Sequence, residues 1–180
     1  MSGLIIDGFA GAGGASSGIA RAMGRDPDYA INHNAEALAV HEANHPDTVH
    51  LWGNIWDTNP TQLCAGRPVD VAWFSPDCRH FSRAKGGKKT SARVRSLASA
   101  VIPWAREARP RIIFMENVEE WKSWGPLDEN GDPVVRKIGL SFRTWHGKIK
   151  AQGYKTDMRT LRACDYGAPT NRKRLFFIAR

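Results

Sequence analysis

Residues 69–82 read VDVAWFSPDCRHFS, and this stretch decides how the chain is expected to fold. The apolar run Val69–Phe74 is typical of a buried strand, and it ends abruptly at Ser75 and Pro76. The strand therefore delivers a single cysteine, Cys78, into the loop that follows it.

The loop after this strand is strongly basic. No acidic residue occurs from Arg79 to Arg95, and the positive side chains are those of Arg79, Arg83, Lys85, Lys88, Lys89, Arg93 and Arg95. A thiol needs nearby positive charge to become a nucleophilic thiolate. A polyanion needs the same charge for binding. The loop therefore predicts covalent chemistry on a nucleic acid, with Cys78 as the nucleophile.

The composition agrees with a basic, globular protein. The chain of 180 residues fits one domain, and its formal net charge of +8 favours an acidic partner. The cysteines, Cys64, Cys78 and Cys164, are too few and too scattered for a disulfide framework or a structural zinc site. No signal peptide or membrane-spanning run is visible, so we expect no membrane partner and a cytoplasmic location.

Apolar, β-rich runs alternate with helical patterns on both sides of this stretch. The expected strands are Leu4–Asp7, Tyr29–Asn32, Thr48–Leu51, Val69–Phe74 and Arg111–Met115. The expected helices are Ala15–Met23, Ala35–Asn44, Arg93–Ala108 (kinked or split at Pro103) and Ser141–Gln152. The segment Gly125–Gly139 reads as a loop. Such alternation predicts an α/β fold, a parallel sheet with helices on both faces.

The end of the chain has a different pattern. Lys155–Arg162 and Arg172–Ala179 are two strand-like runs, and the turn between them is too short for a crossover helix. These two strands should therefore be antiparallel. A mostly parallel sheet with an antiparallel final hairpin is the layout of the S-adenosylmethionine-dependent methyltransferase fold.

A glycine-rich turn follows the first expected strand. Residues 7–18 read DGFAGAGGASSG, and glycines there let the backbone approach a ligand closely. It is not a dinucleotide fingerprint, because Ser16 stands where the third glycine would be needed. The turn predicts a cofactor site in an α/β sheet.

Four motifs, taken in order, resemble those of the DNA cytosine-5 methyltransferase family. Residues 9–14, FAGAGG, look like its cofactor loop, and residues 75–82, SPDCRHFS, look like its nucleophile loop, S-P-P-C-x-x-F-S. Residues 116–118 match its E-N-V motif, and residues 169–174, PTNRKR, resemble P-Q-x-R-x-R. The resemblance covers nearly the whole chain.

The resemblance implies a covalent methyl transfer to cytosine. The Cys78 thiolate would add to C6 of the base, C5 would then take the methyl group of S-adenosylmethionine, and loss of the C5 proton would release Cys78. Glu116 would donate a proton to N3. Arg172 and Arg174 would support the site and the base O2, with Arg174 as the direct contact. The base must be flipped out of the duplex.

The cofactor site implied by the resemblance departs from the family pattern. Its loop is formed by Phe9, Ala10, Gly11, Gly13 and Gly14. The acidic residue that binds the cofactor ribose is replaced by an amide or imidazole at Asn32 or His33, and the adenine-contacting Asp is replaced by Asn54. Asp77 replaces a proline before the cysteine, and Thr170 replaces a glutamine in the last motif. Amides still form hydrogen bonds but lack the charge of a carboxylate, so we expect cofactor binding to be weakened rather than lost.

Residues 41–45, HEANH, match the zinc-protease pattern H-E-x-x-H. Pro46 ends the helix at the second histidine, and His50 is the only near candidate for a third ligand. We therefore expect no metal site, and a zinc hydrolase is a remote alternative.

Family members continue beyond the position that corresponds to Arg180, into a target-recognition domain and a closing helix. We therefore expect residues 1–180 to be a catalytic core, either truncated or one half of a split enzyme with a second chain. Alternatives are a non-catalytic nucleic-acid-binding remnant and an RNA cytosine-5 methyltransferase, since nothing in the sequence distinguishes DNA from RNA.

Overall fold

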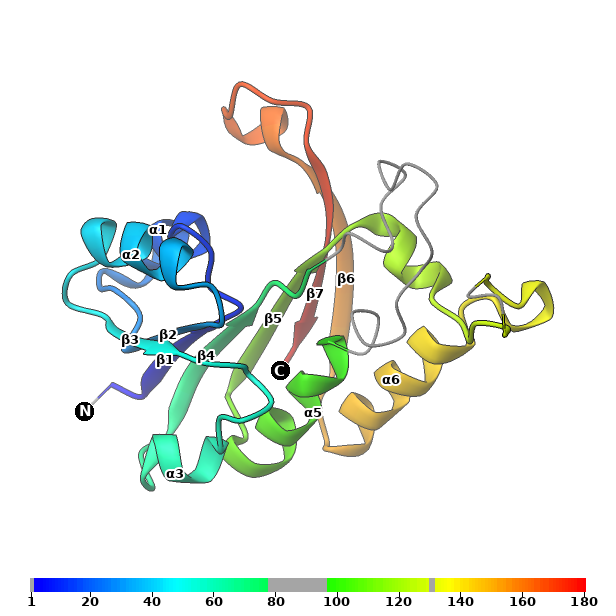
Figure 1. Ribbon diagram of the computed structural model, residues 1–180, viewed down its shortest axis with the longest axis horizontal. Coiled ribbons are helices and arrows are strands. Elements are labelled where there is room, and N and C mark those ends of the chain that lie inside the picture. Colours follow the sequence, from blue (N-terminus) through cyan, green and yellow to red (C-terminus); the bar gives the residue numbers. More distant parts are fainter. Residues whose placement is uncertain (1, 78–96, 130–131) are drawn as a thin grey trace. The chain divides into compact units, whose positions relative to one another are not determined.

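The computed structural model describes residues 2–77, 97–129 and 132–180 (Figure 1). The described residues divide into two compact units. The first lies within Met1–Ser75, Pro103–Met115 and Arg180, and the second within Pro76–Ile102 and Glu116–Ala179. The two units are described separately below.

The first unit contains a parallel sheet. Its strands are β1 (Leu4–Gly8), β2 (Tyr29–Asn32), β3 (Val49–Trp52), β4 (Val69–Phe74) and β5 (Ile112–Asn117), of which the last two residues belong to the second unit. Their order across the sheet is β3-β2-β1-β4-β5, and each described pair is parallel. The expected strands are confirmed to within two residues at each end.

The burial of each strand matches its position in the sheet. All residues of β1 are buried, which suits a strand between two neighbours with both faces covered. The edge strand β3 has no fully buried residue. Gly8, the last residue of β1, lies opposite Ile31 of β2 and Phe74 of β4. The loops that follow these three strands therefore begin at the same edge of the sheet.

Helices α1 (Gly14–Met23), α2 (Ala35–Asn44) and α3 (Pro60–Cys64) belong to the first unit. The first two match the prediction, and they lie side by side in Figure 1. Asn34 caps α2 by accepting a hydrogen bond from the Ala37 N–H at 3.0 Å. Helix α3 was not predicted, because a five-residue helix is too short for a periodic pattern.

The helical segment predicted over residues 93–108 is split at Pro103, as expected. Residues 93–96 lie outside the described residues, and the rest is divided into a 3₁₀ turn (Leu97–Ala100), α5 (Val101–Pro103) and a π-helix (Trp104–Ala108). The change of helix type falls at Pro103, which was expected to kink or split it. The π-helix closes with the Arg109 N–H donating to the Trp104 carbonyl at 3.0 Å.

The second unit contains the final hairpin. Strands β6 (Thr156–Arg162) and β7 (Lys173–Ala179) pair in antiparallel register, with Leu161 opposite Arg174. The hairpin is thus confirmed. Arg172, predicted as the first residue of the strand, lies just before it. The connection contains a 3₁₀ turn, Ala163–Tyr166.

Aromatic side chains form the core of the second unit. Helix α6 (Leu140–Ala151) contributes Phe142 and Trp145, whose ring centroids lie 4.9 and 4.7 Å from that of Trp121. Phe177 of β7 packs against Trp145 at 4.9 Å. Trp121 lies in a 3₁₀ helix, Glu119–Ser123, directly after β5. The hairpin and the end of β5 are therefore held by one buried cluster.

The described residues of the expected loop Gly125–Gly139 contain only short secondary-structure elements. It contains a single bridge between Leu127 and Pro133 and a 3₁₀ turn, Val135–Lys137. Across the described ranges, no helix is long and apolar enough to cross a membrane.

Candidate functional site

The glycine-rich loop after β1 is built on backbone hydrogen bonds to β2. The Ala10 N–H donates to the Ile31 carbonyl at 3.0 Å, and the Ala10 carbonyl accepts from the Asn32 side chain. Phe9 has a positive φ of 60°, which is unusual for a residue other than glycine. Ala10 is therefore fixed, and Phe9 is held in a conformation that turns the loop sharply out of the strand.

The Asn32 side chain forms hydrogen bonds within the chain through both its nitrogen and its oxygen. Its Nδ2 donates to the Ala10 carbonyl, and its Oδ1 accepts from the Asn34 N–H at 3.0 Å. These contacts make Asn32 a support of the loop. The neighbouring His33 side chain is exposed.

Asn54 lies beside this group at the end of β3. The Gly53 N–H donates to the Asn32 carbonyl at 3.0 Å, which sets Asn54 next to the end of β2. The Oδ1 of Asn54 accepts from the Trp56 N–H at 3.1 Å. The structure therefore brings all the predicted cofactor residues to the carboxyl edge of β1, β2 and β3, where α/β sheets bind ligands.

The loop fits a closely approaching cofactor. At Gly11 and Gly14, no atom lies within 4 Å of the position that a Cβ would take. Both residues are exposed, so the backbone there is open to a ligand. The residues present therefore fit S-adenosylmethionine, the group that the fold implies.

The two histidines of the HEANH segment form hydrogen bonds within the chain. His41 Nε2 lies 2.9 Å from Ser16 Oγ, and His45 Nε2 lies 3.1 Å from the Gly13 carbonyl. Among the residues that the structure describes, no group of three or more His, Cys, Asp or Glu side chains could hold a metal ion.

Glu116, Arg172 and Arg174 come together in the second unit. Arg174 Nε lies 3.0 Å and Arg172 Nη2 lies 3.3 Å from the same carboxylate oxygen, Oε1 of Glu116. The Glu116 side chain is 17% exposed, against 21% for Arg174 and 55% for Arg172. Arg174 is therefore the more enclosed of the two arginines, which suits its predicted role as the direct contact.

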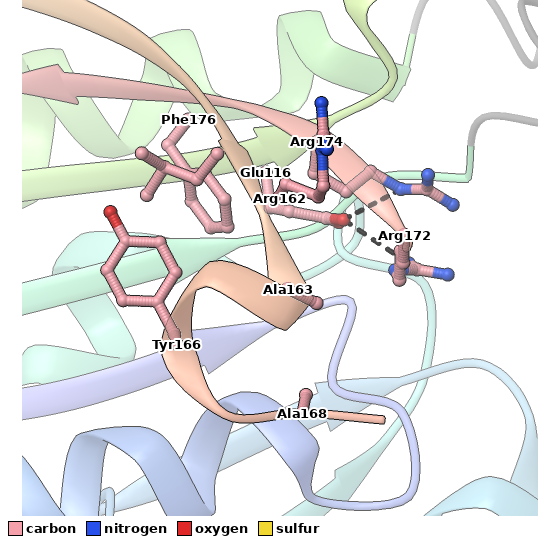
Figure 2. Close-up of a pocket in the computed structure, with 9 residues that line it drawn as sticks. Glu116, Arg162, Ala163, Tyr166, Ala168, Arg172, Arg174 and Phe176 are labelled. Carbon is pink, nitrogen blue, oxygen red and sulfur yellow. Dashed lines mark hydrogen bonds and ion pairs between the residues drawn. The ribbon is translucent and has the colours of Figure 1, made fainter. Parts of the chain in front are cut away.

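A pocket of about 360 Å³ adjoins this carboxylate. It is lined by Glu116, Leu161, Arg162, Ala163, Tyr166, Ala168, Arg172, Arg174 and Phe176. Figure 2 shows the rings of Tyr166 and Phe176 on one side and the two arginines with Glu116 on the other. Such a combination of flat apolar walls and a few convergent polar groups suits a nucleobase.

Asn117, the residue after Glu116, contacts the start of the predicted nucleophile loop. Asn117 is buried, and its Nδ2 donates to the Pro76 carbonyl at 3.3 Å. Its Oδ1 accepts from the Val118 N–H at 2.8 Å. The predicted nucleophile, Cys78, lies outside the described residues.

Lys173 belongs to a separate ion pair. Its Nζ lies 3.0 Å from Oε2 of Glu119, and this hydrogen bond and the lysine charge lower the pKa of Glu119. Of the three consecutive basic residues, Lys173 therefore pairs with Glu119, whereas Arg172 and Arg174 pair with Glu116. The alternation follows from the period of two along a strand.

Sequence reasoning missed the apolar walls of the pocket. Leu161 lies opposite Arg174 in the hairpin register, and Tyr166 lies in the connecting turn. The predicted hairpin could have identified Leu161, because antiparallel pairing places this residue beside Arg174 once the register is known. Asn117 was read only as part of a motif, and its contact with Pro76 was not predicted.

The fold is that of the S-adenosylmethionine-dependent methyltransferases, as predicted. The family model for C-5 cytosine-specific DNA methylases matches residues 4–180, so the chain belongs to that family.

Relatives support the same assignment. The chain is 33% identical over 176 residues to the Type II methyltransferase M.AgeI of Thalassovita gelatinovora, with 95% of this chain and 38% of the relative covered. It is 30% identical to the Type II methyltransferase M.DdeI of Desulfomicrobium norvegicum, with 97% and 40% covered. The chain therefore spans about two fifths of the length of these relatives.

Solved structures share the fold. One, a protein encoded within an E. coli prophage, has a TM-score of 0.74 and 26% identity, with 99% of this chain and 46% of that chain covered. The S. pombe Dnmt2 methyltransferase has a TM-score of 0.72, with 99% of this chain and 49% of that chain covered. Its identity of 16% supports the fold alone.

Proposed function

We propose that this chain transfers a methyl group from S-adenosylmethionine to C5 of cytosine in DNA. The observation that carries the proposal is the contact of Glu116 with both Arg172 and Arg174 beside a base-sized pocket, in a chain of this family. The net charge of +8 favours a polyanionic substrate.

Glu116 and the arginines act on the flipped base. Both arginines contact Oε1 of Glu116, and Oε2 takes part in neither contact. Oε2 is therefore the oxygen that meets N3 of the base, where Glu116 supplies a proton as charge builds on the ring. Arg174 donates to the base O2, and Arg172 holds the carboxylate from the solvent side.

Cys78 is the nucleophile in this proposal. Its thiolate adds to C6, which makes C5 nucleophilic. After methylation, water takes the C5 proton, the C5–C6 double bond re-forms, and the C6–sulfur bond breaks to return the thiolate. S-adenosylmethionine supplies an electrophilic methyl group when bound. Phe9, Ala10, Gly11, Gly13 and Gly14 form its loop, with Asn54 beside it. Asn32 supports that loop through the Ala10 carbonyl.

A trapped adduct tests the mechanism. A duplex with 5-fluorocytosine keeps a fluorine where the C5 proton would leave, so the cysteine remains bonded to C6. We expect a shifted band on a denaturing gel with S-adenosylmethionine and the wild-type protein, and none with Cys78→Ala.

Three results would contradict the proposal. An equal band with Cys78→Ala would exclude Cys78 as the nucleophile. A DNA complex on a native gel without any covalent band would point to a non-catalytic binding protein. A matching RNA with 5-fluorocytosine, trapped in preference to DNA, would change the substrate class.

A further inference from the structure

Two buried histidines, His41 and His45, contact the turn that begins α1. His41 lies in α2 and is fully buried, and His45 follows α2 with 4% of its surface exposed. They are the histidines of the HEANH segment, to which the proposed function gives no part. Their contacts lie at the end of the cofactor loop.

Both ring nitrogens of His45 have polar partners. Its Nδ1 lies 2.8 Å from Oδ1 of Asp26, and its Nε2 lies 3.1 Å from the Gly13 carbonyl. A carbonyl oxygen only accepts hydrogen bonds, so the bond to Gly13 requires a proton on Nε2. The hydroxyl of Ser17 lies 3.2 Å from the same Nε2. His45 therefore joins α2 to the last residue of the loop and to the first turn of α1.

Gly13 is shaped to this histidine. Its φ is +101°, and a Cβ there would lie 2.8 Å from Cδ2 of His45. No side chain caps the N-terminus of α1 at this position. The imidazole of His45 thus leaves no room for a side chain at residue 13, and the positive φ there also favours glycine.

His41 makes a second, parallel connection. Its Nε2 lies 2.9 Å from Ser16 Oγ, which lies 2.7 Å from Oδ2 of Asp7 at the end of β1. Its Nδ1 lies 2.8 Å from Nε2 of His50 in β3. Asp7 is 1% exposed, and its other oxygen, Oδ1, has no hydrogen-bond partner among the described residues. His41 therefore joins α2 to Ser16 of α1, and Ser16 in turn joins α1 to β1 through Asp7.

We propose that His41 and His45 are positioning residues for S-adenosylmethionine binding, acting through Ser16, Ser17 and Gly13. This inference rests on the proposed function of the Phe9–Gly14 loop. A glycine-rich loop left free must be ordered when a ligand binds, and that ordering weakens affinity. The histidines hold the C-terminal end of the loop beforehand, and Ser16 links that end to β1 through Asp7, so the HEANH segment serves cofactor binding.

A matched pair of substitutions at His45 tests this role. A glutamine amide nitrogen reaches the place of Nε2, so His45→Gln keeps the donor to Gly13. An asparagine amide nitrogen reaches the place of Nδ1, so His45→Asn keeps the donor to Asp26 and loses Gly13. By calorimetry with S-adenosylmethionine and S-adenosylhomocysteine, we expect His45→Gln to bind within about threefold of wild type and His45→Asn about tenfold more weakly.

Steady-state kinetics and a control separate positioning from general destabilisation. At saturating cofactor, the kcat of both variants should stay within about threefold of wild type, and only the KM for the cofactor should rise for His45→Asn. His146→Asn removes a histidine hydrogen bond of the second unit, 2.8 Å from Thr156 Oγ1. It should lower the Tm without changing cofactor affinity.

Two results would overturn the inference. His45→Asn could bind the cofactor as tightly as wild type, or His45→Gln could lose as much affinity as His45→Asn. A wild-type protein that binds neither compound would overturn the proposed cofactor site itself, and the inference with it. That failure is distinguishable, because no variant would then bind.

Discussion

Arg174 of β7 lies with its Nε 3.0 Å from Oε1 of Glu116 at the end of β5. Arg172, just before β7, contacts the same oxygen at 3.3 Å. Two guanidinium groups thus converge on one side of the carboxylate, and Oε2 takes part in neither contact. The arrangement makes the roles of the two arginines separable by experiment.

Replacing Arg174 should harm methylation more than replacing Arg172. Arg174 is the closer and more enclosed ion-pair partner of Glu116, so its loss removes the shorter and less solvent-screened of the two ion pairs. We expect Arg174→Ala to lower kcat by roughly 100-fold, and Arg172→Ala by about tenfold or less. Incorporation of radioactive methyl groups into DNA measures both. Equal losses, or the reverse order, would remove the distinction.

Glu116→Gln should leave the fold intact and slow methylation by roughly two to four orders of magnitude. An amide still donates a hydrogen bond to N3 but cannot transfer a proton. The matched control is Glu119→Gln, since Glu119 is half exposed and pairs with Lys173 instead. We expect that control to stay within about threefold of wild type. Similar rates for both variants would exclude Glu116 from proton transfer.

The thiols of Cys64 and Cys164 should differ in reactivity. Burial raises the pKa of Cys64, which lowers its thiolate fraction at a given pH, whereas Cys164 is exposed. In the folded protein, iodoacetamide should label Cys164 at least about tenfold faster than Cys64. Peptide mass spectrometry measures both rates, and unfolding in urea should remove the difference. Rapid labelling of Cys64 in the native protein would mean that its helix opens readily.

Acid should destabilise the protein in part through His146. Burial and the Lys150 charge hold the pKa of His146 below its ordinary value of 6.5, so the folded state binds fewer protons than the unfolded state. Stability is therefore lost as the pH falls through 6.5 toward the folded pKa.

His146→Gln should reduce this loss, because the variant has no imidazole to protonate. The measurement is Tm across a pH series for both proteins. His50, whose pKa burial and His41 also lower, should account for part of the remaining dependence. An identical pH dependence in the variant and the wild type would show that His146 titrates alike in both states.

The main strands and the order of motifs could be read from the sequence because their signals are local. A mostly apolar run such as Val69–Phe74 indicates a buried strand by its composition alone, and the short turn before β7 allows only an antiparallel return. The split of the 93–108 helix at Pro103 was predicted for the same reason, but the 3₁₀ and π-helical turns around it were not. A helical period reports one buried face, but it does not say whether each turn closes as an α-, 3₁₀- or π-turn near Pro103.

From the sequence alone we predicted which residues carry the proposed chemistry: Glu116, the two arginines, and the glycine-rich loop after β1. How these residues are held became visible only in the folded chain. Asn32 supports Ala10, His45 holds Gly13, and one oxygen of Glu116 takes both arginines. The physical reason is that a hydrogen bond depends on positions and directions of atoms far apart in the chain. Strand register and helix packing set those positions, and no local pattern contains them.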